Sequence, residues 1–163
     1  MSTSSTRSVG PYKRSPTVDR APWQAGVMDL ADAHHRVRSA RVGRLATVTA
    51  DGRPHVVPCC FAFDGSDRIV NAVDAKPKST GALKRLDNVR ANSAVSLLVD
   101  HYDDTDWSQL WWVRVDGDAR VVESGPEHDS ALAVLVEKHP QYQQTPPPGA
   151  VVAIDHLRWR SWP

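Results

Sequence analysis

The sequence contains very little cysteine: only Cys59 and Cys60, side by side in a chain of 163 residues. Neighbouring strand residues point to opposite faces of a sheet, so a bond between these two sulfurs would be strained. A fold built on disulfides is therefore excluded. The pair instead predicts two small buried side chains in a protein of the reducing cytoplasm.

An excess of charge of one sign is also lacking. Lysine and arginine together number 20 and aspartate and glutamate 19, which leaves a formal net charge of +1. No overall field would draw such a chain to DNA, RNA or a membrane surface. We therefore expect neither a nucleic-acid nor a membrane partner, and a local cluster of cations would have to meet any anionic ligand.

Long apolar runs are absent as well. No stretch approaches the roughly 18 residues of a membrane span. Residues 1–26 combine serine, arginine and proline without the apolar segment of a secretory signal. We expect residues 1–26 to form a disordered leader. Residues 27–163 are expected to form one folded, cytoplasmic domain.

The common catalytic and metal-binding motifs are missing too. The seven histidines are scattered, with no HExxH pattern and no cysteine pair at zinc spacing, so no metal site is predicted. A Gly-x-Ser-x-Gly elbow, a Walker loop and a dinucleotide-binding glycine pattern are also lacking. Catalysis by an activated nucleophile is not expected, and no catalytic residue is assigned.

What the sequence does contain is a clear succession of hydrophobic periods. Helical spacing predicts helices over residues 27–41, where Leu30, Ala33 and Val37 carry the spacing, over 126–139, and over a basic segment capped at Ser79 or Thr80. The expected strands share a period of two or bounding glycine turns, and cover residues 43–50, 55–63, 68–73, 93–100, 110–123 and 150–162. The proline-rich segment 140–149 is expected to be irregular.

The order of these elements predicts the fold class. Six strands, with helices inserted after the third and the fifth, do not alternate as βαβ units. The pattern favours an α+β protein built on an antiparallel barrel or a half-closed sheet.

The basic segment KPKSTGALKRLDNVRAN covers residues 76–92. On a helix, Lys84, Arg85 and Asn88 share one flank, while apolar residues hold the other side against the sheet. Lys78 precedes the helix, where free backbone N–H groups and the helix dipole favour an anion. A lysine and an arginine converging there suit a phosphate. A solvated face with extended cations fits the same spacing, and periodicity does not decide between the two.

Tryptophan is abundant, with six residues in the chain. Trp107, Trp111 and Trp112 stand around the start of the fifth predicted strand. They suit either packing in a core or dimer interface, or the covering of a flat conjugated ring.

Several stretches together resemble a known family. GRLATVTADGRPHVVPCCFAFD, then KPK, LKRLDNVRAN and VSLLVD, then DDTDWSQLWWVRVDGDARV are similar to the pyridoxamine-phosphate-oxidase-like split-barrel proteins that bind flavins or deazaflavins. The likeness covers residues 27–162 and is greatest to the actinobacterial branch that uses the deazaflavin coenzyme F420. It implies a six-stranded split β-barrel and a homodimer with two cofactor clefts at the subunit interface.

The resemblance also implies the cofactor-binding residues. Arg85 and Asn88 match phosphate-binding positions of the family, and Lys84 and Lys78 are assigned as supporters by their charge. Val57 and Pro58 on the second strand and Asn71 and Val73 on the third match positions that line the ring cleft, and Trp107 matches a tryptophan in the loop after the fourth strand. The family also contains FMN users, so FMN remains the alternative cofactor.

The activity implied is hydride transfer between C5 of the deazaflavin ring and a small unsaturated or conjugated substrate. The cofactor carries the chemistry, while the protein supplies orientation and dryness. A proton would come from solvent or from a cleft residue such as His55. Two other readings stay open: an FMN-dependent oxidase of the pyridoxamine phosphate type, and a carrier that binds the cofactor without catalysis.

Overall fold

The structure is a computed structural model that describes residues 28–65, 67–74 and 81–162. The expected leader, residues 1–26, and Lys78 lie outside the described residues. The elements in chain order are α1 (Leu30–Ser39), β1 (Val42–Val48), β2 (Pro54–Cys60), β3 (Ala62–Phe63), β4 (Ile69–Ala72), α2 (Gly81–Ala91), β5 (Ala94–His101), a 3-10 helix η2 (Trp107–Gln109), β6 (Trp111–Val122), α3 (Pro126–Lys138), α4 (Pro140–Gln144) and β7 (Val151–Trp162).

The strands form one antiparallel sheet in the order β2-β1-β5-β6-β7-β4-β3. The two edge strands, β2 and β3, are separated in the chain by the single residue Phe61. The edges of the sheet must therefore lie next to each other, which forces the sheet to curl into a half-closed barrel. Phe61 is fully buried at this seam. The predicted α+β split barrel is confirmed.

Two details of the prediction are wrong. The strand expected over residues 55–63 is divided at Phe61, so the described sheet has seven strands instead of six. The segment expected to be irregular contains the short helix α4. Pro140 is compatible with this helix because the first helical position needs no backbone N–H. Tyr142 of α4 is buried.

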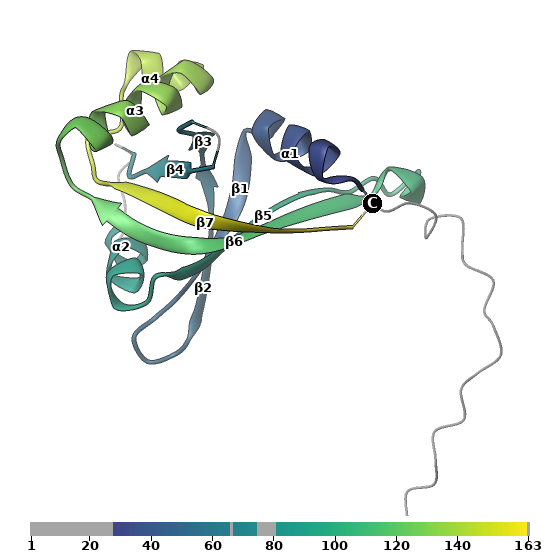
Figure 1. The fold of residues 1–163 in the computed structure, drawn as a ribbon, viewed down its shortest axis with the longest axis horizontal. Coiled ribbons are helices and arrows are strands. Elements are labelled where there is room, and N and C mark those ends of the chain that lie inside the picture. The colour runs from purple at the N-terminus through teal and green to yellow at the C-terminus, as the bar shows by residue number, and fades with distance from the viewer. Residues whose placement is uncertain (1–27, 66, 75–80, 163) are drawn as a thin grey trace, which may run out of the picture.

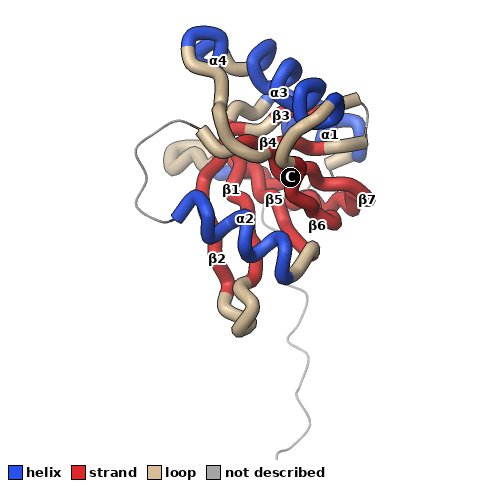
Figure 2. The backbone as a smooth tube through the Cα atoms, turned by 90° about the vertical axis from the view of Figure 1, so that its left-hand side faces the viewer, coloured by secondary structure: helices blue, strands red, loops and turns tan. Residues whose placement is uncertain are grey.

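The helices lie on both sides of the curled sheet. Figure 1 shows α3 and α4 together above the end of the sheet that carries β3 and β4, with α1 on the same side. Figure 2 shows α2 on the other side, beside β1 and β2. The main core cluster fills the barrel and takes in Leu86 and Val89 of α2. A second cluster, including Leu135 and Tyr142, lies under α3 and α4.

The first helix is shorter than predicted. The carboxylate of Asp29 accepts a hydrogen bond from the N–H of Asp32 at 2.7 Å and so caps α1 at Leu30. Ala33 and Val37 are buried as their spacing indicates, whereas Leu30 is 60% exposed. Among the described residues, no helix is long and apolar enough to cross a bilayer.

The long strands β6 and β7 pair along most of their length, with a register shift between Asp116 and Asp118. Gly117 stands in this shift because no side chain fits there. A Cβ at this position would lie 2.6 Å from Cγ2 of Ile154 and 2.8 Å from the backbone oxygen of Asp155. The shift lets both halves of β7 stay paired while the sheet bends.

Candidate cofactor site

Arg85 is buried inside the fold although it belongs to the basic helix. Leu86 and Val89 pack into the core, which fixes the rotation of α2 on the sheet. In this orientation Arg85 is 6% and Asn88 4% exposed, while Lys84 is exposed. The predicted common flank is therefore wrong for Lys84. An ordinary solvated face is excluded for Arg85 and Asn88.

A cavity of about 330 Å³ lies where the two edges of the sheet meet. Its walls come from β1, the end of β2, the end of β4, α2 and α4. The lining residues are Val42, Pro58, Cys59, Cys60, Ala72, Asp74, Arg85 and Tyr142. Five separate segments of the chain thus contribute to the cavity that Arg85 lines.

The guanidinium of Arg85 is only partly satisfied by the described protein. One Nη donates to the backbone oxygen of Ala72 at 3.4 Å, while Nε is buried without a hydrogen-bond partner. A buried charged donor without an acceptor is costly, and a ligand oxygen would remove that cost. Asp74 lines the same cavity.

Two thiols and a phenol complete this cavity. Burial raises the pKa of the Cys59 thiol to about 11, although the nearby charge of Arg85 acts in the opposite direction. The pKa of Tyr142 is also raised, mainly by burial. Its hydrogen-bonded neighbour Cys60 acts in the same direction. The raised pKa values keep Cys59 and Tyr142 protonated at neutral pH, so these two groups carry no negative charge.

Asn88 is not among the residues that line the cavity, and it belongs instead to a short chain of polar contacts one turn along α2 from Arg85. Its Nδ2 donates to Oγ1 of Thr47 at 2.9 Å. That oxygen lies 3.4 Å from both Nδ1 and the backbone oxygen of His55. Thr47 is buried, and its role was missed because threonine in a strand pattern gives no signal of a helix contact. Asn88 thus ties α2 to β1 and β2.

The four residues predicted to line the ring cleft lie in different environments, and only one of them reaches the cavity. Pro58 lines the cavity and is exposed, while Val57 is half-buried on the other face of β2. Asn71 of β4 is fully buried, and neither its amide nitrogen nor its oxygen has a hydrogen-bond partner in the described structure. Val73 follows β4, and its N–H donates to the oxygen of Ala150 at 3.1 Å.

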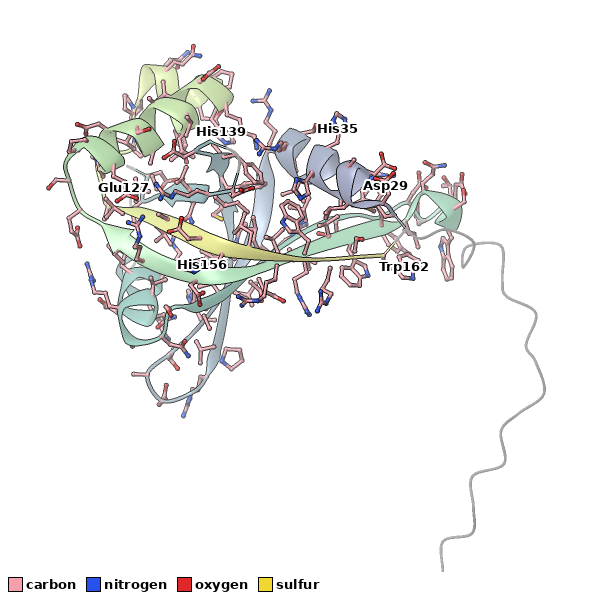
Figure 3. All side chains as sticks on the ribbon, viewed as in Figure 1. Asp29, His35, Glu127, His139, His156 and Trp162 are labelled. Carbon is pink, nitrogen blue, oxygen red and sulfur yellow. The ribbon has the colours of Figure 1, made fainter. Side chains whose placement is uncertain are left out.

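Trp107 is not brought to the cavity within one chain. It lies in η2, between β5 and β6, with 55% of its surface exposed. This turn is at the far end of the long strands, beside Trp162, whereas α2 lies at the opposite end (Figures 1 and 3). One copy of the chain therefore assembles the arginine side of the expected site without the tryptophan.

The fold and this seam cavity define a split-barrel protein with one buried arginine at its ligand-sized opening. The family described as Pyridoxamine 5'-phosphate oxidase matches residues 30–163. The chain belongs to this family.

Individual relatives agree with that assignment. A 5a,11a-dehydrotetracycline/5a,11a-dehydrooxytetracycline reductase of Streptomyces rimosus is 32% identical over 89 residues, which cover 55% of this chain and 61% of the reductase. The match therefore spans about three fifths of that relative's length.

Solved structures share the fold. The conserved hypothetical protein Rv2991 of Mycobacterium tuberculosis is 28% identical, with a TM-score of 0.64 over 83% of this chain and 85% of its own. An FAD-binding protein of Mesorhizobium loti is 24% identical, with a TM-score of 0.55 over 82% of this chain and 94% of its own.

Proposed function

We propose that the protein is an oxidoreductase that binds coenzyme F420 and reduces a small unsaturated or conjugated substrate. The observation that carries this proposal is the buried Arg85, whose Nε lacks an acceptor at the edge of a cavity. The family and the tetracycline-type reductase among its relatives support redox chemistry. The preference for F420 rests on the likeness of the sequence stretches to the F420-using branch.

The residues fit the phosphate-bearing end of such a cofactor. Arg85 would donate to phosphate oxygens, the interaction for which a guanidinium is best shaped. Lys84, exposed on the same helix, and Lys78 would add positive charge around the anionic tail. Asn88 and Thr47 would hold α2 at the correct distance from β1.

The size of the cavity supports a site shared between two copies. About 330 Å³ is at the lower end of the range of ligand pockets, roughly 300–1,000 Å³, and is small for a ring system with a phosphate and a tail. Val42 at the cavity and Val56 on β2 expose 44% and 59% of their surfaces. A homodimer would cover these side chains, and Trp107 of the second copy would then reach the ring.

The bound cofactor would supply the hydride. The chain's own residues would hold the phosphate, exclude water and position the substrate over the ring. A proton would come from solvent or from the half-buried His55, which Thr47 holds beside Asn88. The protonated thiol of Cys59 and phenol of Tyr142 would add no negative charge of their own next to an anion.

Fluorescence titration of the purified protein with F420 and, separately, with FMN tests the proposal. We expect saturable F420 binding with weaker FMN binding. Arg85→Met should weaken F420 binding roughly tenfold to hundredfold, because a hydrogen bond to a charged group contributes roughly 1.5–3 kcal/mol. Arg90→Met is the matched control, since Arg90 lies on the same helix but is exposed and paired with Asp87 and Glu123.

The outcomes separate the readings. Tighter FMN binding would favour a flavin oxidase on the same fold. Binding of F420 without turnover of enone or quinone acceptors would favour a carrier. An Arg85→Met variant that folds and binds F420 like the wild type would remove Arg85 from the site.

A further inference from the structure

A second cavity lies between α1, β3 and α3. It has a volume of about 360 Å³ and shares no lining residue with the cofactor cavity. The lining residues are Arg38, Ala62, Phe63, Val134, Glu137 and Lys138. Its polar side therefore carries two cations and one carboxylate, and its apolar side is made by β3 and the middle of α3.

Lys138 is the unusual group in this cavity. Its Nζ is buried and makes no hydrogen bond within the described part of the chain. The ammonium lies over the ring of Phe61, 4.3 Å from the centroid. That contact occupies one side of the ammonium and offers no hydrogen-bond acceptor, so the three N–H donors stay unsatisfied.

The surroundings make this site electropositive. The guanidinium of Arg38 stacks 4.1 Å from the centroid of Phe63, and Arg41 donates to the backbone oxygen of Lys138 at 2.6 Å. The pKa of Lys138 is lowered to about 8, and burial is the largest cause. Repulsion from Arg41 and Arg38 lowers it further, whereas Cys60 on β2 raises it. Glu137 lines the same cavity, and the neighbouring His139, labelled in Figure 3, is turned to the backbone oxygen of Phe61 at 3.0 Å.

We infer that this cavity binds a small oxyanion, a carboxylate or phosphate-like group carried on an apolar body, with Lys138 and Arg38 as its charged partners. An oxyanion supplies the acceptors that the buried Nζ lacks and relieves the repulsion among the three cations. Ala62 and Val134 form an apolar wall that suits the uncharged part of the ligand. This site is independent of the proposed function, because neither cation lines the seam cavity.

Calorimetric titration of the full chain with sulfate and with butanoate tests the inference. Both probes keep their charge between about pH 6.5 and about pH 10, so a change of affinity in that range reports on the protein. We expect saturable binding that weakens above about pH 8 as Lys138 loses its proton. Binding of both probes indicates a general oxyanion site, and binding of butanoate alone indicates a carboxylate site that needs the apolar wall.

Lys138→Met should weaken binding at least roughly tenfold and remove the pH dependence, because the donors are lost. Arg53→Met removes an exposed cation on the β1–β2 turn and should change affinity less than about twofold. In the wild type, NMR titration of Lys138 should show a higher pKa with saturating sulfate, which tests the site without any variant. Failure of both probes to saturate, or wild-type binding by a folded Lys138→Met, would overturn the inference, whatever the F420 titration shows.

Discussion

Arg85 and Lys138 are both cations with nitrogen atoms withdrawn from water, but the protein treats them differently. Arg85 keeps one hydrogen bond to the backbone, and Asp74 lines its cavity. Lys138 has an aromatic ring below it and two arginines nearby. A guanidinium keeps its charge under all ordinary conditions, whereas an ammonium can release a proton to avoid the cost of burial. Of these two cations, only Lys138 can therefore titrate near physiological pH.

The stability of the protein should report this titration. The pKa of Lys138 is about 8 in the folded chain and 10.5 in its ordinary state, so unfolding takes up a proton between these values. The contribution of Lys138 to the free energy of unfolding must then increase as pH rises from about 8 to about 10.5. Below that window, Lys138→Met should stabilise the protein by about 1 kcal/mol, a value reduced because the side chain is only partly buried.

Urea unfolding of wild type and Lys138→Met across this pH range checks the prediction. The stability difference should shrink towards high pH, where the lysine is neutral in both states. Cys59 also has a raised pKa, so its contribution to the free energy of unfolding falls as pH rises from about 9 to about 11. That contribution is the same in both proteins and disappears from their difference. A difference that does not change with pH would contradict the assignment.

The hydroxyl of Thr47 should stabilise the fold more than its methyl group does. Thr47→Val leaves Nδ2 of Asn88 buried without an acceptor and should lower the free energy of unfolding by about 1–3 kcal/mol. Thr47→Ser keeps the hydroxyl and should lose markedly less. Equal losses in the two variants, measured by urea unfolding, would mean that methyl packing dominates at this position.

For single residues, the sequence predicts which side chains belong to the site better than it predicts which groups surround them. Spacing correctly put Arg85 and Asn88 on one helix, but it also placed Lys84 with them. The rotation of α2 depends on how Leu86 and Val89 meet the sheet, which is a tertiary effect. Cys59, Asp74 and Tyr142 became part of the cavity only through folding, since they come from separate segments.

Among the elements, β6 and β7 determine the shape of the sheet, and the bend between them depends on Gly117. Gly117→Ala places a Cβ against Ile154 and against a backbone oxygen that cannot rotate away. We expect a loss of about 1–3 kcal/mol in the free energy of unfolding, the usual effect of overpacking. A variant as stable as the wild type in urea would show that β7 shifts freely at this point.

The start of α1 gives a second prediction for an element. Asp29→Ala removes the side-chain acceptor for the N–H of Asp32 and should lower the free energy of unfolding by about 1 kcal/mol. Asp29→Asn keeps an acceptor and should lose much less. If thermal unfolding shows the same loss for both variants, charge at the helix start, and not the cap, is responsible.

Element positions were largely predictable because hydrophobic periods are local. The exceptions have physical causes. Cys60 to Phe63 keep a continuous strand pattern, so the sequence does not reveal that the chain changes from one sheet edge to the other at Phe61. Residues 140–144 look like a proline-rich loop, but the buried Tyr142 and a proline at the first position allow one helical turn.

For the whole molecule, the prediction concerns the proposed association of two copies. Val56→Glu puts a charge among the exposed apolar side chains of β1 and β2 and should convert the proposed dimer to monomers. Cofactor affinity should fall at the same time, because Trp107 of the second copy would be lost. Light scattering after size exclusion measures the mass, with Gln144→Glu on α4 as a control for added charge.

The proposed dimer has a clear alternative outcome. A wild-type protein that is monomeric at micromolar concentration and still binds F420 tightly would contradict a shared cleft. The sequence could predict the split barrel because families preserve the order of strands. Association depends on which apolar side chains remain uncovered after folding, and Val56 becomes identifiable as exposed only in the folded sheet.

The strand order has a consequence for synthesis on the ribosome. Within the described sheet, β3 pairs with β4, and β4 is connected to the remaining strands by its pairing with β7. In that pair, Ala72 lies opposite Val151 and Ile69 opposite Ile154. Translation delivers β4 some eighty residues before β7. Until residues 151–162 leave the exit tunnel, the nascent chain holds an apolar strand with no neighbour on that side. The barrel can therefore close only after β7 has left the tunnel, so the sheet is completed by the last of its strands to be made.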